Sequence, residues 1–294
     1  MFRPFLLPCR FDSGKGRLAE RCIITFVRIP AHGADCRIVD YRICLPYGFW
    51  GSIGGLFCMP SLRVKLFQDG ADLASMIAAR DCGLVSGYTT NPTLMRKAGI
   101  IDYRGFARQV IAAIPDMPVS FEVFSDDFET MEREAREIAS WGGNTYIKIP
   151  ITNTKGQSAG PLISTLSKEG FSLNVTAMLT LEQVDIVAAA VSPSSRTIVS
   201  VFAGRIADTG IDPVPVMTEA IRRLSHLPKA ELLWASPREV LNVAQADACG
   251  CHIITATPDI IAKLALSGKD LSQYSLETVK MFYDDARGAG YKLV

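Results

Sequence analysis

The stretch TYIKIP, residues 145–150, combines the alternation of a β-strand with a charged residue near its middle. Ile147 and Ile149 lie on one face of such a strand, and Lys148 lies on the other. Parallel strands covered by helices are normally apolar, and an unpaired ammonium group is costly to bury. A lysine here can be a loop residue, or can extend its charge to the surface along its own stem. Within a barrel strand, however, it indicates a polar site.

Seven further strand-like runs accompany this one. They are VKLFQD (64–69), GLVSGYT (83–89), PVSFEV (118–123), FSLNVT (171–176), TIVSVF (197–202), AELLWAS (230–236) and HIITAT (252–257). Helical patterns lie between them, as at 126–141 and at 213–227, which opens with proline. Eight strand–helix units over about 200 residues predict an α/β fold, a closed (β/α)8 TIM barrel. An extra C-terminal helix over 276–286 is expected to pack across the barrel or on a neighbouring subunit.

Residues 1–60 differ in composition and are predicted to be an extension of the barrel formed by 61–294. Five of the eight cysteines lie in this extension, without a C-x-x-C spacing. The uncharged stretch 43–59 contains a proline and four glycines, a poor composition for a membrane helix. Two explanations stay open for the first 58 residues. Either translation begins at Met59, which we favour, or the segment is a genuine but poorly ordered extension.

Charge and histidine content limit the partners and cofactors. Thirty-one Lys and Arg against thirty Asp and Glu give a net charge of +1, which argues against a general nucleic-acid binder. The histidines His32, His226 and His252 are scattered singly, so no metal centre and no cofactor is expected. The cysteine pattern fits free thiols in a reducing cytoplasm. Neither nucleic acid nor a membrane is expected as a partner.

Polar residues recur on one face of four predicted strands. They are Ser120, Glu122, Lys148, Ser172, Asn174, Thr176 and Ser200. In a barrel this face points inward, and active sites lie at the carboxyl ends of the strands. Each residue also has a structural interpretation, since Glu122 could pair with an arginine and the others could satisfy backbone groups. The coincidence across four strands favours a site.

A lysine in a polar interior with two carboxylates suggests Schiff-base chemistry. Burial lowers the pKa of an amine and raises its neutral, nucleophilic fraction. The neutral amine attacks a carbonyl, and the protonated imine then withdraws electrons from the adjacent carbon–carbon bond. Asp69 and Glu122 are the candidates for proton transfer. The residues therefore predict a class I, metal-free aldol reaction.

The sequence resembles the transaldolase family, which includes small transaldolases and fructose-6-phosphate aldolases. The resemblance covers residues 64 to about 266. It rests on LFQDGAD (66–72), GYTTNPTL (87–94), SFEV (120–123), YIKIPIT (146–152), LNVTAML (173–179), VSVFAGRIADTG (199–210), WASPREV (234–240) and GCHIITATPDII (250–261). It implies a cytoplasmic enzyme of the pentose phosphate pathway that acts on sugar phosphates and forms a homo-oligomer.

The resemblance also implies residue roles. Lys148 forms the Schiff base, Asp69 shuttles a proton on the substrate hydroxyl, and Glu122 and Thr176 hold the water of imine formation and release. The substrate-binding positions are Asn91, Asn174, Ser200 and Phe202 around the dihydroxyacetone portion, and Arg205, Ser236 and Arg238 at the phosphate. A guanidinium group suits phosphate oxygens, although a surface salt bridge is an alternative for both arginines.

Departures from the family pattern affect specificity. Glu122 and Phe202 follow the transferase branch, whereas Gly70, Pro237 and Glu239 leave phosphate and acceptor specificity open. The leading hypothesis is transfer of a dihydroxyacetone unit from a ketose phosphate to an aldose phosphate. One alternative is fructose-6-phosphate aldolase-type cleavage that releases free dihydroxyacetone. A second alternative is a non-catalytic barrel that binds sugar phosphates.

Overall fold

The computed structural model describes residues 25–27, 38–40 and 62–294. The chain divides into two units, Met1–Cys58 and Met59–Val294. In the first unit, β1 (Thr25–Val27) and β2 (Ile38–Asp40) form an antiparallel pair. The predictions of a start at Met59 and of a poorly ordered extension concern residues outside the described part.

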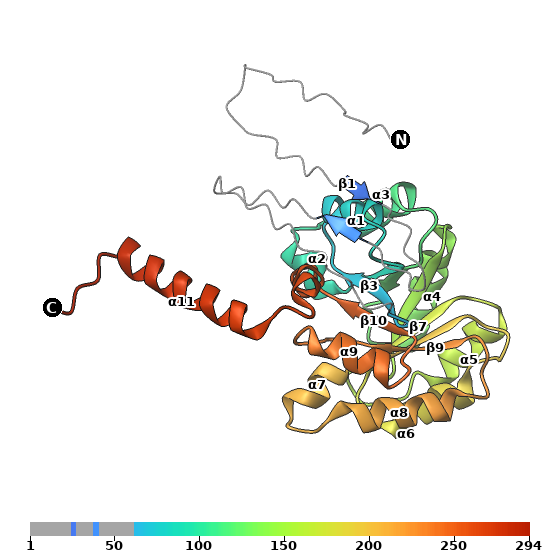
Figure 1. The fold of residues 1–294 in the computed structure, drawn as a ribbon. Coiled ribbons are helices and arrows are strands. Elements are labelled where there is room, and N and C mark those ends of the chain that lie inside the picture. The colour runs from blue at the N-terminus through green and yellow to red at the C-terminus, as the bar shows by residue number, and fades with distance from the viewer. Residues whose placement is uncertain (1–24, 28–37, 41–61) are drawn as a thin grey trace, which may run out of the picture. The chain divides into compact units, whose positions relative to one another are not determined.

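The second unit is a closed barrel of eight parallel strands (Figure 1). The strands are β3 (Lys65–Asp69), β4 (Gly87–Thr89), β5 (Val119–Glu122), β6 (Thr145–Pro150), β7 (Leu173–Met178), β8 (Thr197–Val201), β9 (Ala230–Trp234) and β10 (Ile253–Ala256). They neighbour one another in chain order, and β10 closes the sheet by pairing with β3. The predicted (β/α)8 barrel is confirmed.

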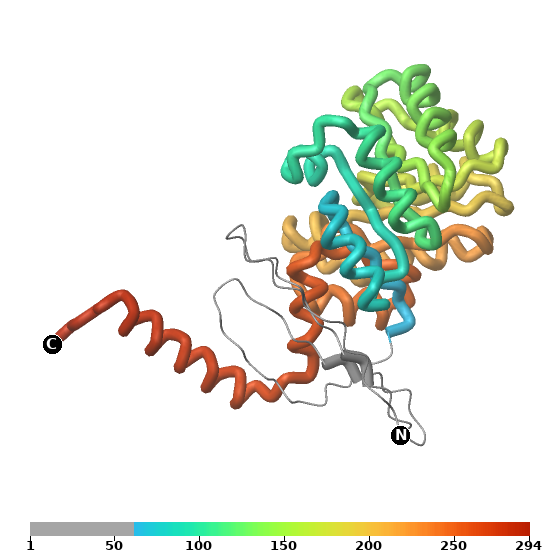
Figure 2. Tube along the Cα trace, turned by 90° about the horizontal axis from the view of Figure 1, so that it is seen from above, coloured from blue at the N-terminus to red at the C-terminus, as the bar shows by residue number. Residues whose placement is uncertain are grey.

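Helices follow the strands and form the outer layer of the barrel (Figures 1 and 2). They are α1 (Leu73–Asp81), α2 (Pro92–Lys97), α3 (Tyr103–Ala113), α4 (Phe128–Ser140), α5 (Gly160–Lys168), α6 (Leu181–Ala190), α7 (Ala203–Asp208), α8 (Pro213–Leu224), α9 (Leu241–Ala248) and α10 (Pro258–Lys263), with α11 (Leu271–Gly288) at the C-terminus. Within residues 62–294 and the two short strands before them, no helix has both the length and the apolar character needed to cross a bilayer.

Several boundaries differ from the predicted ones because local backbone geometry decides them. The strand predicted at 83–89 begins only at Gly87, since Gly83 has a positive φ of 64° and makes a turn. The strand predicted at 171–176 is β7, which continues to Met178 through a register shift against β8. The helix predicted at 126–141 is α4, whose first turn is capped by the Asp127 carboxylate. The helix predicted at 213–227 is α8 and ends at Leu224.

The predicted alternation of the strands produces two apolar cores. The outer core, between strands and helices, includes Val119, Phe121, Ile147, Ile149, Leu173, Val175, Val199 and Val201. The second core lies inside the barrel and consists of Phe67, Tyr146, Ile198, Leu233, Ala235 and Ile253. Phe67, Tyr146 and Ile198 each lie two residues before a predicted site residue on the same strand. Their side chains therefore point to the same side of the strand as that site residue, one layer deeper in the barrel. We call this second core the apolar floor.

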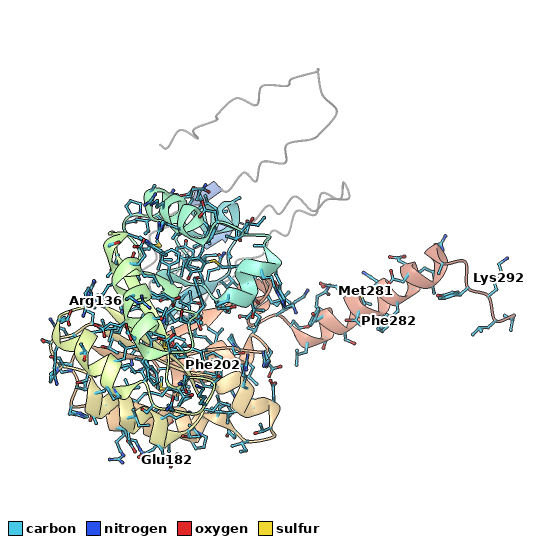
Figure 3. All side chains as sticks on the ribbon, turned by 180° about the vertical axis from the view of Figure 1, so that it is seen from behind. Arg136, Glu182, Phe202, Met281, Phe282 and Lys292 are labelled. Carbon is cyan, nitrogen blue, oxygen red and sulfur yellow. The ribbon has the colours of Figure 1, made fainter. Side chains whose placement is uncertain are left out.

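Helix α11 is longer than predicted and does not pack as one alternative expected. It begins after Asp270, whose side chain accepts a hydrogen bond from the Gln273 N–H. None of its residues is buried, and Figures 2 and 3 show it extending away from the barrel. Met281 and Phe282 are 50% and 63% exposed. Packing across the barrel is therefore not observed, and packing on a neighbouring subunit stays a prediction.

Candidate active site

Lys148 lies on β6 with its side chain inside the barrel and only 6% of the residue exposed. It is in register with Glu122, the last residue of β5. Its Nζ lies 3.0 Å from Glu122 Oε2 and donates a hydrogen bond to the Thr90 carbonyl at 2.9 Å. The amine therefore has the paired, hydrogen-bonded surroundings that a buried charge requires. The structure brings the predicted lysine and carboxylate together.

Asp69 ends β3 at the same end of the barrel. The Thr89 hydroxyl donates to Asp69 Oδ1 at 2.7 Å and lies 2.6 Å from the Thr255 hydroxyl. Burial raises the pKa of Asp69, against the opposing effects of the Lys148 charge and the Thr89 hydrogen bond. A raised pKa brings a carboxyl group closer to neutral pH, where it exchanges protons more effectively.

Asn174 lies at the centre of a polar network on β5, β7 and β8. Its Nδ2 donates to the Ser120 hydroxyl at 2.9 Å, and its Oδ1 accepts from the Ser200 hydroxyl at 2.7 Å. Asn174 is in register with Lys148 across the β6–β7 pair. Both side-chain ends of Asn174 are thus occupied, so a ligand hydroxyl at this place must share or replace one of these hydrogen bonds.

Thr176 lies two residues beyond Asn174 on β7, on the same face of the strand. Its hydroxyl is buried and has no hydrogen-bond partner among the described residues. Ala177, the next residue, has a positive φ of 63°, at the register shift between β7 and β8. A buried polar atom of this kind is a natural contact for a bound water. This hydroxyl can therefore form a hydrogen bond with a molecule that enters the site, and its water-holding role stays a prediction.

Asn91 has a structural role that the sequence analysis did not predict. It caps α2 through its Oδ1, which accepts a hydrogen bond from the Leu94 N–H at 3.0 Å. The cap uses only the acceptor end of the amide, so the Nδ2 donor is the atom available to a ligand.

The predicted phosphate-binding residues lie after β8 and β9. The Arg205 guanidinium lies 5.1 Å from the centre of the Phe202 ring, which packs against the apolar floor and is labelled in Figure 3. Ser236 has a positive φ of 60°, and its carbonyl closely approaches Gly204. A Cβ atom at Gly204 would stand 1.6 Å from that oxygen. The two loops are therefore held in direct contact.

Arg238 forms the salt bridge that the sequence analysis left open as an alternative. Its Nε donates to Asp208 Oδ1 at 2.9 Å, and its Nη2 donates to Oδ2. These hydrogen bonds lower the pKa of Asp208, and the Arg205 charge acts in the same direction. Both arginines therefore act on one exposed carboxylate, with which a phosphate group would have to compete.

Sequence reasoning missed Thr89, Thr90 and Asp208 as parts of this arrangement. Both threonines stand in the quoted segment GYTTNPTL, and Asp208 stands in VSVFAGRIADTG. Thr90 contacts Lys148 through its backbone carbonyl, which no pattern of side chains can mark. Asp208 lies one helical turn beyond Arg205 on α7, a spacing that could have indicated shared contacts.

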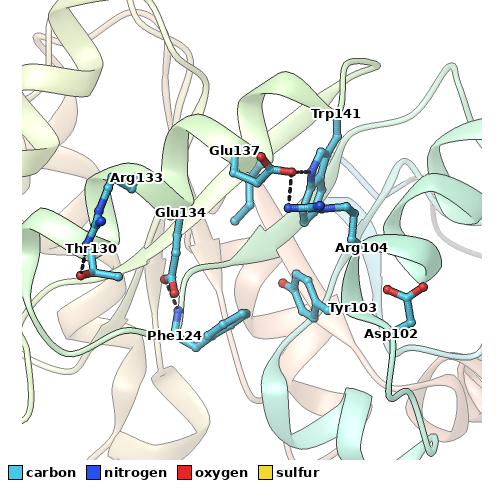
Figure 4. Close-up of a pocket in the computed structure, with 10 residues that line it drawn as sticks. Asp102, Tyr103, Arg104, Phe124, Thr130, Arg133, Glu134, Glu137 and Trp141 are labelled. Carbon is cyan, nitrogen blue, oxygen red and sulfur yellow. Dashed lines mark hydrogen bonds and ion pairs between the residues drawn. The ribbon is translucent and has the colours of Figure 1, made fainter.

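A surface groove of about 620 Å³ lies between α3 and α4 (Figure 4). Its charged side chains are engaged locally: Arg104 pairs with Glu137, and Glu134 accepts hydrogen bonds from the backbone N–H groups of Phe124 and Ser125. Lys148 and Asp69 do not line it. The groove is thus distinct from the site inside the barrel, although Tyr103 forms part of its wall.

The family model described as Transaldolase/Fructose-6-phosphate aldolase matches residues 66–292. The chain belongs to this family. A "Probable transaldolase" of Thermoanaerobacter sp. is 36% identical over 233 residues, covering 78% of this chain and 100% of the relative. A "Probable transaldolase" of Dehalococcoides mccartyi is 33% identical over 202 residues, covering 68% of this chain and 90% of the relative.

Among solved structures, a dihydrodipicolinate synthase from Rhodopseudomonas palustris aligns with a TM-score of 0.49 and 14% identity, covering 77% of this chain and 82% of that chain. Membership in the transaldolase/fructose-6-phosphate aldolase family confirms the resemblance seen in the sequence. It supports an enzyme with aldolase-type activity.

Proposed function

We propose that this protein transfers a dihydroxyacetone unit from a ketose phosphate to an aldose phosphate through a Schiff base on Lys148. The observation that carries the proposal is the buried amine held 3.0 Å from Glu122 at the end of the barrel that also holds Asp69. Burial excludes water and strengthens electrostatic effects on the reacting atoms. The relatives named "Probable transaldolase" support the same reaction class.

The first half-reaction begins when Glu122 takes a proton from the Lys148 ammonium group and the resulting neutral amine attacks the ketose carbonyl. The carbinolamine takes this proton back as it loses water, which gives a protonated imine. Glu122 and the Thr176 hydroxyl are proposed to hold that water. Asp69 takes the proton of the hydroxyl on the carbon at the far end of the bond that breaks, so this carbon becomes the aldehyde carbon of the leaving aldose phosphate. The electron pair of the carbon–carbon bond moves to the iminium as an enamine, and an aldose phosphate leaves.

The second half-reaction reverses these steps with a different aldehyde. The enamine carbon attacks the acceptor carbonyl, and Asp69 returns its proton to the new alkoxide. Water then hydrolyses the imine and regenerates Lys148. Asn91, Asn174 and Ser200 are proposed to bind the hydroxyl groups of the dihydroxyacetone unit beside Phe202, and Arg205, Ser236 and Arg238 are proposed to bind the phosphate group.

Reduction of the imine tests the central step. Incubation with fructose 6-phosphate and sodium borohydride should add a stable dihydroxyacetone-derived mass to the peptide that contains Lys148. Lys148→Met should stay unlabelled, whereas the exposed Lys155→Met should label like the wild type. A folded wild-type protein that is not labelled, or is labelled elsewhere, contradicts the proposal.

Product analysis separates transfer from the alternative of simple cleavage. With fructose 6-phosphate alone, a transferase holds the dihydroxyacetone unit on the enzyme, whereas an aldolase releases it. Addition of erythrose 4-phosphate should produce a seven-carbon ketose phosphate in a transferase. Steady release of free dihydroxyacetone, unaffected by the acceptor, would instead establish the fructose-6-phosphate aldolase reaction.

We further propose a cytoplasmic homo-oligomer that works in the pentose phosphate pathway with sugar phosphates as its partners. This proposal rests on family membership alone. Sedimentation of the full chain measures the oligomeric state. A single species at the monomer mass contradicts that part of the proposal.

A further inference from the structure

Glu122 pairs with Lys148 on the β6 side of β5, but it has no strand partner on the β4 side. Strand β4 ends at Thr89, and the last strand-type hydrogen bond on this side runs from the Thr90 N–H to the Ser120 carbonyl at 3.2 Å. The chain then turns into α2 at Pro92. Alternate residues of a strand direct their backbone groups to the same neighbour, so those of Glu122 face the side that β4 has left. They need another partner.

The Tyr103 hydroxyl supplies that partner from the first residue of α3. It accepts a hydrogen bond from the Glu122 N–H at 2.8 Å and donates one to the Glu122 carbonyl at 2.9 Å. One side chain thus supplies both hydrogen bonds that a longer β4 would have provided to Glu122. Burial raises the pKa of Tyr103. The hydroxyl therefore stays protonated and can donate its hydrogen bond to the Glu122 carbonyl.

Aromatic packing holds the Tyr103 ring in place. It meets Phe124 edge-to-face with ring centres 5.3 Å apart, and lies 6.3 Å from Phe121 and 5.9 Å from Trp141. Figure 4 shows Tyr103 between Phe124 and Trp141. Trp141 is held in turn by Glu137, which accepts from its Nε1 at 2.9 Å. Such edge-to-face contacts fix the ring and therefore the hydroxyl.

We propose that Tyr103 is a positioning residue that sets the place of the Glu122 carboxylate relative to the Lys148 amine. It holds both backbone polar groups of Glu122, and that residue's carboxylate lies 3.0 Å from Nζ. Proton transfer depends steeply on such distances, and a misplacement of about 1 Å can slow a reaction about 100-fold. The inference rests on the proposed Schiff-base function.

Tyr103→Phe tests the inference because it keeps the ring and its packing and removes only the hydroxyl. The matched control is Tyr88→Phe on β4. Tyr88 is buried, and its hydroxyl donates to the Met76 carbonyl at 2.7 Å in the outer core, away from Lys148. For both variants, kcat, KM and the rate of borohydride trapping with fructose 6-phosphate are measured below their unfolding temperatures.

We expect Tyr103→Phe to lower kcat and the trapping rate between about tenfold and 100-fold, with KM changed less than about threefold. Tyr88→Phe should keep kcat within about threefold at a comparable loss of thermal stability. Equal kcat and trapping rates in the two variants, with a wild type that labels at Lys148, overturn the inference and leave the proposed function standing. A wild type without label at Lys148 overturns both.

Two further measurements separate positioning from general stability. In a Glu122→Gln background there is no carboxylate to place, so Tyr103→Phe should lower kcat less than about threefold further. A full additional tenfold loss there contradicts the inference. Replacing the Tyr103 hydroxyl by an amino group, with p-aminophenylalanine, keeps a donor and an acceptor and should restore trapping. The p-aminophenylalanine variant also tests the inference if Tyr103→Phe does not fold. If this variant folds and its rate of borohydride trapping is about tenfold lower than that of the wild type, the inference is overturned.

Discussion

Lys148 Nζ and Glu122 Oε2 lie 3.0 Å apart, and the two side chains are only 7% and 18% exposed. Removal of one partner from such a pair leaves the other charge buried without compensation. The pair should therefore affect both the stability of the fold and the proposed reaction. The free energy of unfolding and the rate of imine trapping measure these two effects separately.

Glu122→Gln should lower the free energy of unfolding by about 3 kcal/mol, because it leaves the Lys148 ammonium without a counter-charge. Chemical denaturation measures this value, and the rate of imine trapping should fall with it. Glu182→Gln, on the exposed start of α6 (Figure 3), is the control and should change stability by less than about 1 kcal/mol. Equal effects of the two substitutions would falsify the role assigned to the buried pair.

Asp69→Asn should lower kcat by about 100-fold or more and yet stabilise the protein at neutral pH. The pKa of Asp69 is raised in the folded state, so the folded state binds this proton more tightly than the unfolded state. The stability contributed by protonated Asp69 is full below the ordinary pKa of 3.8 and is lost as the pH rises through the raised value. The Tm advantage of the variant should therefore be largest near neutrality and vanish below about pH 4. A variant that melts below the wild type at pH 7 contradicts this account.

Arg238→Ala should raise KM for fructose 6-phosphate about tenfold to 100-fold, because the loss of a charge-assisted hydrogen bond to phosphate weakens binding by about this factor. Asp208→Asn should lower that KM, because it removes the carboxylate that competes for Arg238. Unphosphorylated fructose provides the comparison, and its KM should change less than about threefold. Arg222→Ala on α8, an exposed arginine paired with Glu219, should leave both values unchanged. Equal shifts for both sugars would show that Arg238 acts on the fold and not on phosphate.

Gly204→Ala should lower the free energy of unfolding by about 3 kcal/mol, because its Cβ would stand 1.6 Å from the Ser236 carbonyl oxygen. The loops after β8 and β9 would have to separate, so KM for a phosphorylated ketose should rise as well. Gly288→Ala at the end of α11 meets nothing within 4 Å and is the control. Thermal melts and KM values measure the two variants. A Gly204→Ala enzyme with unchanged loops and Tm is incompatible with this packing.

The eight strands were predictable from sequence because alternation and spacing are local properties. Lys148 and Glu122 could be placed inside the barrel because their strand neighbours are apolar. The ends of elements were less predictable, since Gly83 and Ala177 take positive φ values that depend on the folded chain. The prediction for the C-terminal helix was also incomplete, because Asp270 starts it earlier and its apolar side chains stay exposed.

The site was predictable in its side chains and less so in its backbone contacts. The polar face of the strands indicated Asn174 and Thr176, and the end of the first strand indicated Asp69. The structure places Asp69 at the expected end of the barrel and the other two on the expected face. Contacts through main-chain atoms, as of Thr90 with Lys148, depend on where β4 stops. Pairing between Asp208 and Arg238 depends on how two loops meet, which local patterns do not encode.

The apolar floor beneath the lysine has a kinetic consequence. Phe67, Tyr146 and Ile198 fill the barrel interior one layer below Asp69, Lys148 and Ser200, and the Arg196 guanidinium lies 5.3 Å from the centre of the Tyr146 ring. The apolar floor closes this end of the barrel. The donor, the departing aldehyde and the incoming acceptor must therefore all pass through the opposite end. The proposed transfer then follows a ping-pong order, in which the first product leaves the site before the second sugar binds.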